Sequence, residues 1–131
     1  MDLNLGILNM ASQLAAHASA RQVAITENIA HADTPGYRAR DIADFATTLE
    51  ATSQPFQARA TRPGHMDFSD GGGAFELREI STFGAESPNG NTVSLEDQMM
   101  RSADVRQNHD MALGVYQKSM EIMRTTLGRG R

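Results

Sequence analysis

The chain has 131 residues, enough for one domain, with a formal net charge of −4 and a sequence pI near 5.5. This acidic balance argues against a general nucleic-acid-binding protein, which is usually basic. Cysteine is absent, which excludes disulfides, thiol nucleophiles and cysteine-ligated zinc, and aromatic residues make up only 5% of the chain. With so few large anchors, we expect either a small core or a core completed against partners.

A helix is predicted over residues 5–31, because apolar residues recur there at spacings of three, four and seven. Arg21 interrupts this apolar stripe. The segment is rich in Ala, the best helix former, whose small side chain lets a second helix approach closely. The members of the stripe are Leu3, Ile7, Met10, Leu14, Ala18, Ile25 and Ile29.

The helix is predicted to end at a specific turn, Thr34-Pro35-Gly36-Tyr37. A residue before proline is disfavoured in the α conformation, so Thr34 should leave the helix. Pro35 and Gly36 fit the two central positions of a type II turn, because Gly accepts a positive φ. Tyr37 then leaves the turn as an anchor with a polar tip.

Residues 45–92 read as a turn-rich insert, with "SQPFQARATRPG", "SDGGG" and "ESPNGN" as loop signals. Between them, residues 65–69 and 74–80 could pair as a short β-hairpin, because Phe75 and Leu77 alternate with charged residues. Partial disorder, or an extended path that depends on a partner, explains the same composition nearly as well.

A second helix is predicted from Leu95 to Leu127, with Ser94 as N-cap and acidic residues in the first turn. Its apolar residues form a heptad seam: Leu95, Met99, Leu113, Tyr116, Met120, Met123 and Leu127. The middle of the seam is polar (Ser102, Arg106 and His109), which is typical of a register device or of a change of partner.

The expected fold class is mainly α. Two long amphipathic helices would pack as a coiled-coil-like inner layer around an irregular or short β-hairpin insert. The expected division is 1–33 for the first helix, 34–44 for the turn and exit segment, 45–92 for the insert and 93–131 for the second helix. We expect the stripe and the seam to bury against each other and against adjacent subunits, since two helices cannot cover all their apolar surface alone. The expected assembly interface comprises Ile7, Met10, Leu14, Ile25, Ile29, Leu95, Met99, Leu113, Tyr116, Met120, Met123 and Leu127.

Catalytic chemistry finds little support in the sequence. The four histidines (His17, His31, His65 and His109) are far apart and form no known metal-binding motif. No Ser lies in a nucleophile elbow, and "DGGGAF" lacks the strand and helix that flank a phosphate-binding loop. The prediction is therefore a protein that is not an enzyme, with no catalytic residues, cofactor or metal.

The segment "ENIAHADTPGYRARD", residues 27–41, resembles the signature of bacterial flagellar axial proteins, the rod and hook group. His31 stands where that family usually has Asn, and an imidazole cannot copy an amide. The segments "ATRPGHM" (60–66) and "NGNTVSLEDQMM" (89–100) are similar to the family's T-x-P-x-H and N-x-V-x-L-x-x-x-M segments. The residues that match the N-I-A-N-x-D-T-P-G-Y signature are Asn28, Ile29, Ala30, Asp33, Thr34, Pro35, Gly36 and Tyr37.

The resemblance implies a structural protein of the proximal rod of the flagellar basal body. Such proteins are exported unfolded by the flagellar type III apparatus without a cleaved signal peptide, and assemble helically into a drive shaft across the periplasm. The implied partners are other rod proteins (FlgC, FlgF and FlgG), FliE, and the base formed by the membrane ring and export gate, with no nucleic acid or small-molecule substrate. The alternative is a soluble helical adaptor or coiled-coil interaction protein without a flagellar role.

Overall fold

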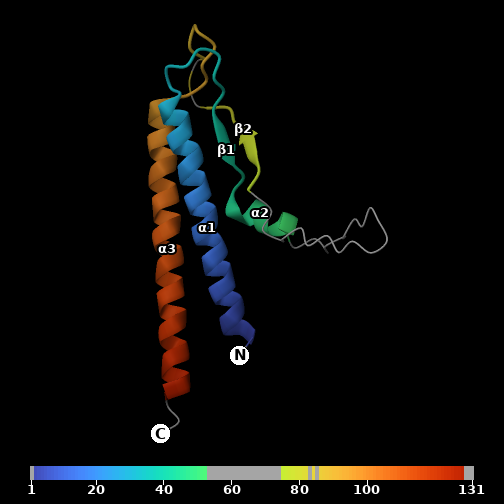
Figure 1. The fold of residues 1–131 in the computed structure, drawn as a ribbon, viewed down its shortest axis with the longest axis vertical. Helices are drawn as coiled ribbons and strands as arrows, with labels where there is room; N and C mark the ends of the chain where they lie inside the picture. Colours follow the sequence, from blue (N-terminus) through green and yellow to red (C-terminus); the bar gives the residue numbers. More distant parts are fainter. Residues whose placement is uncertain (1, 53–74, 83, 85, 129–131) are drawn as a thin grey trace, which may run out of the picture.

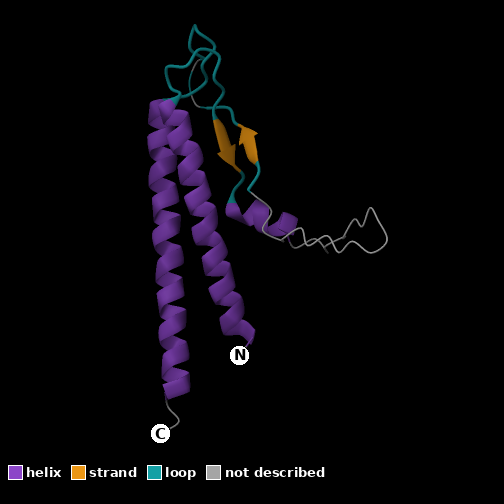
Figure 2. Cartoon of the chain, in the orientation of Figure 1, coloured by secondary structure: helices purple, strands orange, loops and turns teal. Residues whose placement is uncertain are grey.

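The computed structural model describes residues 2–52, 75–82, 84 and 86–128. Two long helices run antiparallel and are joined at one end by turns, while a short β-ribbon lies beside them (Figures 1 and 2). The described helices and strands, in chain order, are α1 (Asp2–Ala30), β1 (Arg40–Ile42), α2 (Phe45–Thr52), β2 (Leu77–Glu79) and α3 (Leu95–Gly128). The mainly helical fold class predicted from the sequence is confirmed.

The long helices begin and end close to the predicted positions. Ser94 caps α3, because its hydroxyl accepts from Asp97 N at 3.4 Å and its carbonyl accepts from Gln98 N at 3.0 Å. Beyond α1, Tyr37 N donates to Thr34 O at 3.3 Å. Gly36 has a φ of +72°, the positive value that the third residue of a type II turn requires.

The contact between α1 and α3 is made by two buried rows in which alanine and other small side chains alternate with a few larger ones. Ala11, Ala18 and Ile25 are buried seven residues apart on α1. They face a buried row on α3 with the same spacing, formed by Gln98, Val105, Ala112 and Ser119. Only Ala18, Ile25 and Val105 form a continuous apolar cluster in the described part of the chain. Small residues let the helix axes approach closely, but they bury little apolar area.

The observed packing differs from the prediction that the apolar seam of α3 buries against α1. Leu113, Tyr116 and Leu127 keep 44%, 42% and 69% of their surface exposed, so they do not bury against α1. The expectation was wrong because it followed the largest apolar side chains, whereas the buried row is displaced by one residue and consists of Gln98, Val105, Ala112 and Ser119. On α1, Ile25 is buried as expected, but Ile7, Met10 and Ile29 are exposed.

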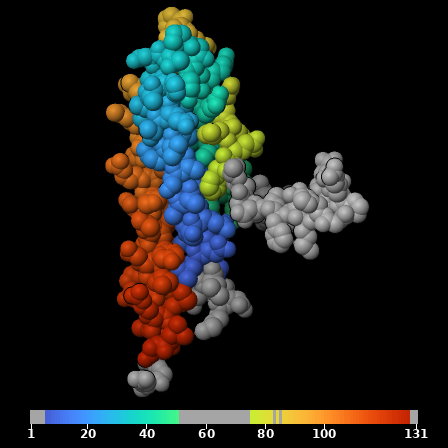
Figure 3. All heavy atoms as spheres, in the orientation of Figure 1, coloured from blue at the N-terminus to red at the C-terminus, as the bar shows by residue number. Residues whose placement is uncertain are grey.

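The β-ribbon pairs segments far apart in the chain. β1 and β2 are antiparallel, with Arg40 opposite Glu79 and Ile42 opposite Leu77. The sequence predicted a strand near β2 but a hairpin with residues 65–69, which lie outside the described residues. Figure 3 shows the ribbon against one side of the helix pair. No helix in the described part of the chain is long and apolar enough to cross a membrane.

Candidate assembly site

The turns that join α1 to β1 and β2 to α3 dock on each other, and we call residues 31–39 and 86–94 together the turn head. Gly36 N donates to Asn89 O at 3.0 Å. Gly90 has a φ of +81°, and a Cβ on it would lie 3.5 Å from the Cα of Gly36. Two glycine turns therefore meet backbone to backbone.

Asn91 fastens the turn head from within. Its side chain is buried, and Nδ2 donates to the carbonyls of His31, Ala32 and Thr34 at 2.9, 2.8 and 2.8 Å. Its Oδ1 accepts from Val93 N at 2.8 Å. A helix end leaves carbonyls without intrahelical partners, and this single amide satisfies those just beyond α1.

Asn28, in the family-like signature, ties three elements together. Nδ2 donates to Arg40 O at 2.7 Å and to Gln98 Oε1 at 3.0 Å. Oδ1 accepts from Arg40 N at 3.0 Å and from the Tyr37 hydroxyl at 3.3 Å. The amide uses its full donor and acceptor capacity, so it fixes β1 and the exit of the turn against both long helices.

His31 makes contacts that an amide would not make. Its ring stacks on Tyr37, with centroids 4.6 Å apart and planes at 20°. Its Nδ1 lies 3.2 Å from Thr34 Oγ1. The ring of His31 makes none of the bonds to the backbone of the head that Asn91 makes, so His31 contributes an aromatic contact on the outside of the turn.

The other signature residues lie on the surface. Ile29, Ala30, Asp33, Thr34 and Pro35 are all exposed. The backbones of Thr34 and Ile29 both bond to the head, but the Ile29 side chain faces solvent at 41% exposure. Nothing inside the described part of the subunit covers this part of the signature.

A buried carboxylate joins the same elements lower down. Asp41 on β1 accepts from Arg21 on α1 at 2.7 and 3.0 Å and from Arg101 on α3 at 2.9 Å. Arg101 also binds Asp97 at 2.8 Å. Burial alone would raise the pKa of Asp41, but hydrogen bonds from Arg21, Ile42 N and Arg101 hold that pKa below its ordinary value. Arg21, which interrupts the apolar stripe, therefore belongs to this ion-pair cluster.

His17 packs against the segment around α2. It is buried, and its Nε2 lies 2.7 Å from Ala43 O, which can only accept, so Nε2 is the donor. Its ring meets Phe45 and Phe75 edge-on at 5.5 and 5.1 Å. Across the described residues, no group of three or more His, Cys, Asp or Glu side chains could hold a metal ion.

Large apolar side chains remain on the surface of both long helices. Met99 is 70% exposed, Leu95 is 51% and Leu127 is 69%. Met120, Met123 and Leu14 are half-buried. The predicted interface residues are thus mostly available to another chain, and their use in assembly stays a prediction.

Sequence reasoning missed the contacts in and beside the head that join distant segments. It used Asn91 only as the first residue of the N-x-V-x-L-x-x-x-M segment, and it predicted neither the ion pairs of Asp41 nor the bond of Gln98. A local sequence signal for Asn91 was present, because Asn91 is the first residue of that family-like segment. Neither the ion-pair cluster nor the Asn28–Gln98 bond, which spans 70 residues, has a local pattern.

Comparison with known proteins places the chain among flagellar proteins. No protein-family model matches it. It is 33% identical over 112 residues to the flagellar basal body rod protein FlgB of Aeromonas hydrophila, covering 83% of this chain and 77% of that protein. It is 28% identical over 131 residues to the FlgB of Bacillus subtilis, covering 100% of both chains. It is 26% identical over 125 residues to the FlgB of Agrobacterium fabrum, covering 94% of this chain and 93% of that protein.

Proposed function

Because the chain belongs to the FlgB family of flagellar basal body rod proteins, we propose that it is a structural subunit of the proximal rod, self-assembling helically with other rod proteins. The assembly would form the drive shaft of the flagellum across the periplasm. The proposal concerns mechanical work: transmission of torque through packed helices, with no catalytic step.

The observation that carries this proposal is the contrast within one subunit. Buried amides hold the turn head together, and Asn28 and the buried Asp41 carboxylate fix β1 against the long helices. The helices themselves share a continuous apolar core of only Ala18, Ile25 and Val105 within the described residues, and leave their largest apolar side chains exposed. Apolar surface of this kind marks contact with other proteins.

The turn would set the angle at which the chain leaves the helical layer. Asn28 and Asp41 hold β1 against α1 and α3 through several bonds of 2.7 to 3.0 Å. A β-ribbon held in this way would project toward neighbouring subunits at one fixed orientation in every copy. Helical assembly needs such uniformity, because every subunit must repeat the same contacts.

The proposed partners follow from family membership: FlgC, FlgF and FlgG as other rod subunits, and FliE with the membrane-ring and export-gate base as the foundation. Export from the cytoplasm without a cleaved signal peptide belongs to the same proposal. An exposed methionine such as Met99, at 70%, would suit contacts with non-identical neighbours, because Met adapts to irregular surfaces.

A clean deletion of the gene, complemented in trans, tests the proposal through motility and electron microscopy of purified basal bodies. We expect membrane rings without a rod in the deletion strain, and complete rods once the intact gene is restored. Complete rods and filaments in the deletion strain, with no paralogue present, would contradict the proposal and favour a helical adaptor.

A further inference from the structure

The side of α1 opposite the β-ribbon carries a shallow apolar groove. The contacts with the ribbon come from Arg21 and Asn28, on the other side of the helix. The groove has a volume of about 400 Å³ and is lined by Ser19, Gln22, Val23, Thr26, Glu27 and Ala30. Val23 is 60% exposed at its centre. Mostly short side chains at spacings of three and four leave room for the side chains of another helix.

One flank of α3 carries the large side chains that such a groove would accept. Met99, Arg106, Leu113, Met120 and Leu127 recur every seven residues, each one position after the buried row that faces α1. One residue is about 100° around a helix, so this flank points beside the intramolecular contact rather than into it. Met99, Leu113 and Leu127 are exposed by 70%, 44% and 69%.

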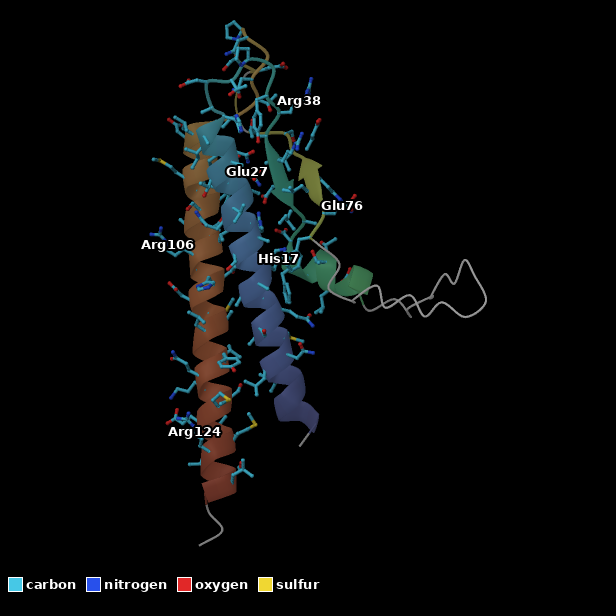
Figure 4. All side chains as sticks on the ribbon, in the orientation of Figure 1. His17, Glu27, Arg38, Glu76, Arg106 and Arg124 are labelled. Carbon is cyan, nitrogen blue, oxygen red and sulfur yellow. The ribbon has the colours of Figure 1, made fainter. Side chains whose placement is uncertain are left out.

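Each of the two surfaces holds a single charge, and the two charges are opposite. Glu27 is the only charged residue that lines the groove. Arg106 is the only charged residue of the flank. Within the described part of the chain neither one forms an ion pair. Figure 4 shows Glu27 toward the turn end of α1 and Arg106 pointing away from α1.

We propose that the α1 groove binds the α3 flank of a second copy of this chain, with Arg106 of one copy opposite Glu27 of the other. The helices run antiparallel in this contact, so Leu113, seven residues beyond Arg106, lies at the level of Ala20, next to Ser19 of the groove. The proposal rests on the proposed function, since it names the contact through which subunits self-assemble. The large side chains of the flank, the short ones that line the groove and the opposite charges together favour a second copy as the occupant.

The proposed contact can repeat from one subunit to the next. Within a subunit α1 and α3 are antiparallel, so an antiparallel contact between α1 and a neighbour's α3 keeps all subunits pointing in one direction. The groove and the flank are different surfaces, and each copy carries both. Such heterologous contacts build open helical assemblies unless the rotation closes a ring.

Single-cysteine variants test the contact cleanly, because the chain has no cysteine of its own. Ser19→Cys and Leu113→Cys copies with distinguishable tags are co-expressed in a deletion strain, and the basal bodies are purified and oxidised. We expect a cross-linked dimer that carries both tags. Leu113→Cys is replaced by Met111→Cys as the matched control, since Met111 is 53% exposed but lies off the flank. That pair should give no dimer.

The outcomes separate the contact from the proposed function. Motile cells whose basal bodies contain the protein but yield no two-tag dimer would overturn the contact and leave the rod function intact. Dimers carrying only one tag, which indicate a two-fold interface, would overturn it as well, as would cross-linking equally strong at Met111→Cys. Absence of the protein from basal bodies would instead contradict the rod function.

A charge swap gives an independent readout. Glu27→Arg and Arg106→Glu should each reduce motility by placing like charges in contact, and the double variant should restore it. Both side chains are exposed, so folding of the subunit is not at stake. Motility unaffected by the single variants, or lost equally in the double variant, would contradict the proposed pairing.

Discussion

The turn head and the long helices are held together by different kinds of contact. In and beside the head, buried polar side chains bond to backbone from several segments, with Asn91 inside the head and Asn28 near the end of α1. Along the helices, the buried contact contains few large apolar side chains besides Ile25, and others such as Met99 and Leu127 face solvent. We therefore expect a subunit to form its head alone, whereas the proposed assembly would give its helices their full support.

The largest effect on the isolated subunit is expected from Asn28→Ala. The change leaves the buried Gln98 side chain and the backbone of Arg40 without partners, which should destabilise the monomer by about 3 kcal/mol. Urea unfolding followed by circular dichroism measures it. Asn9→Ala on the exposed face of the same helix is the control and should cost well under half as much. Equal losses would show that the head is not specially stabilised.

Asp41→Asn should cost about 2 kcal/mol at neutral pH, because Arg21 and Arg101 lose their shared carboxylate. The pKa of Asp41 in the folded subunit lies below its ordinary value of 3.8. Its contribution to stability is therefore fully present above pH 3.8 and is lost as pH falls through the lowered value. Unfolding measured across acid pH should show this loss in the native chain and a shallower one in Asp41→Asn. Parallel curves would contradict the role of the ion-pair cluster.

Pro35→Ala combined with Gly36→Val alters the turn without touching the helix contact. Val is disfavoured at a φ of +72°, so we expect a cost of about 1–2 kcal/mol, with rod assembly impaired more than helix content. Motility reports on rod assembly, and far-ultraviolet circular dichroism measures helix content. Normal motility in the double variant would show that the turn does not determine assembly.

The smallest effect on the subunit, and the sharpest test of the contrast, is expected from Met99→Ser. Met99 is 70% exposed, so the monomer should keep its stability to within about 0.5 kcal/mol. Motility should nevertheless fall. Met100→Ser is the matched control, because Met100 is 71% exposed but does not lie on the α3 flank. Equal motility in the two variants would remove Met99 from the interface.

Local patterns predicted the helices and the turn well, because spacing, the Ser94 cap and the Pro35-Gly36 pair act within a few residues. They did not predict which helix faces meet. Small residues such as Ala18 and Ala112 form that contact, and an Ala-rich helix carries small residues on several faces. Nor could they predict the Asp41 cluster, since the pairing of Arg21 with Asp41 and Arg101 depends on how α1, β1 and α3 come together.

Hydrogen exchange on the purified full-length monomer, compared with the same protein in assembled rods, tests the central contrast most directly. We predict slow exchange for the amides of Gly36 and Thr92 in the monomer, because both are bonded inside the head. Residues 6–14 and 113–127 should exchange fast in the monomer and slowly in rods. Uniform protection of α1 and α3 in the free monomer would contradict the claim that neighbours complete the helical layer.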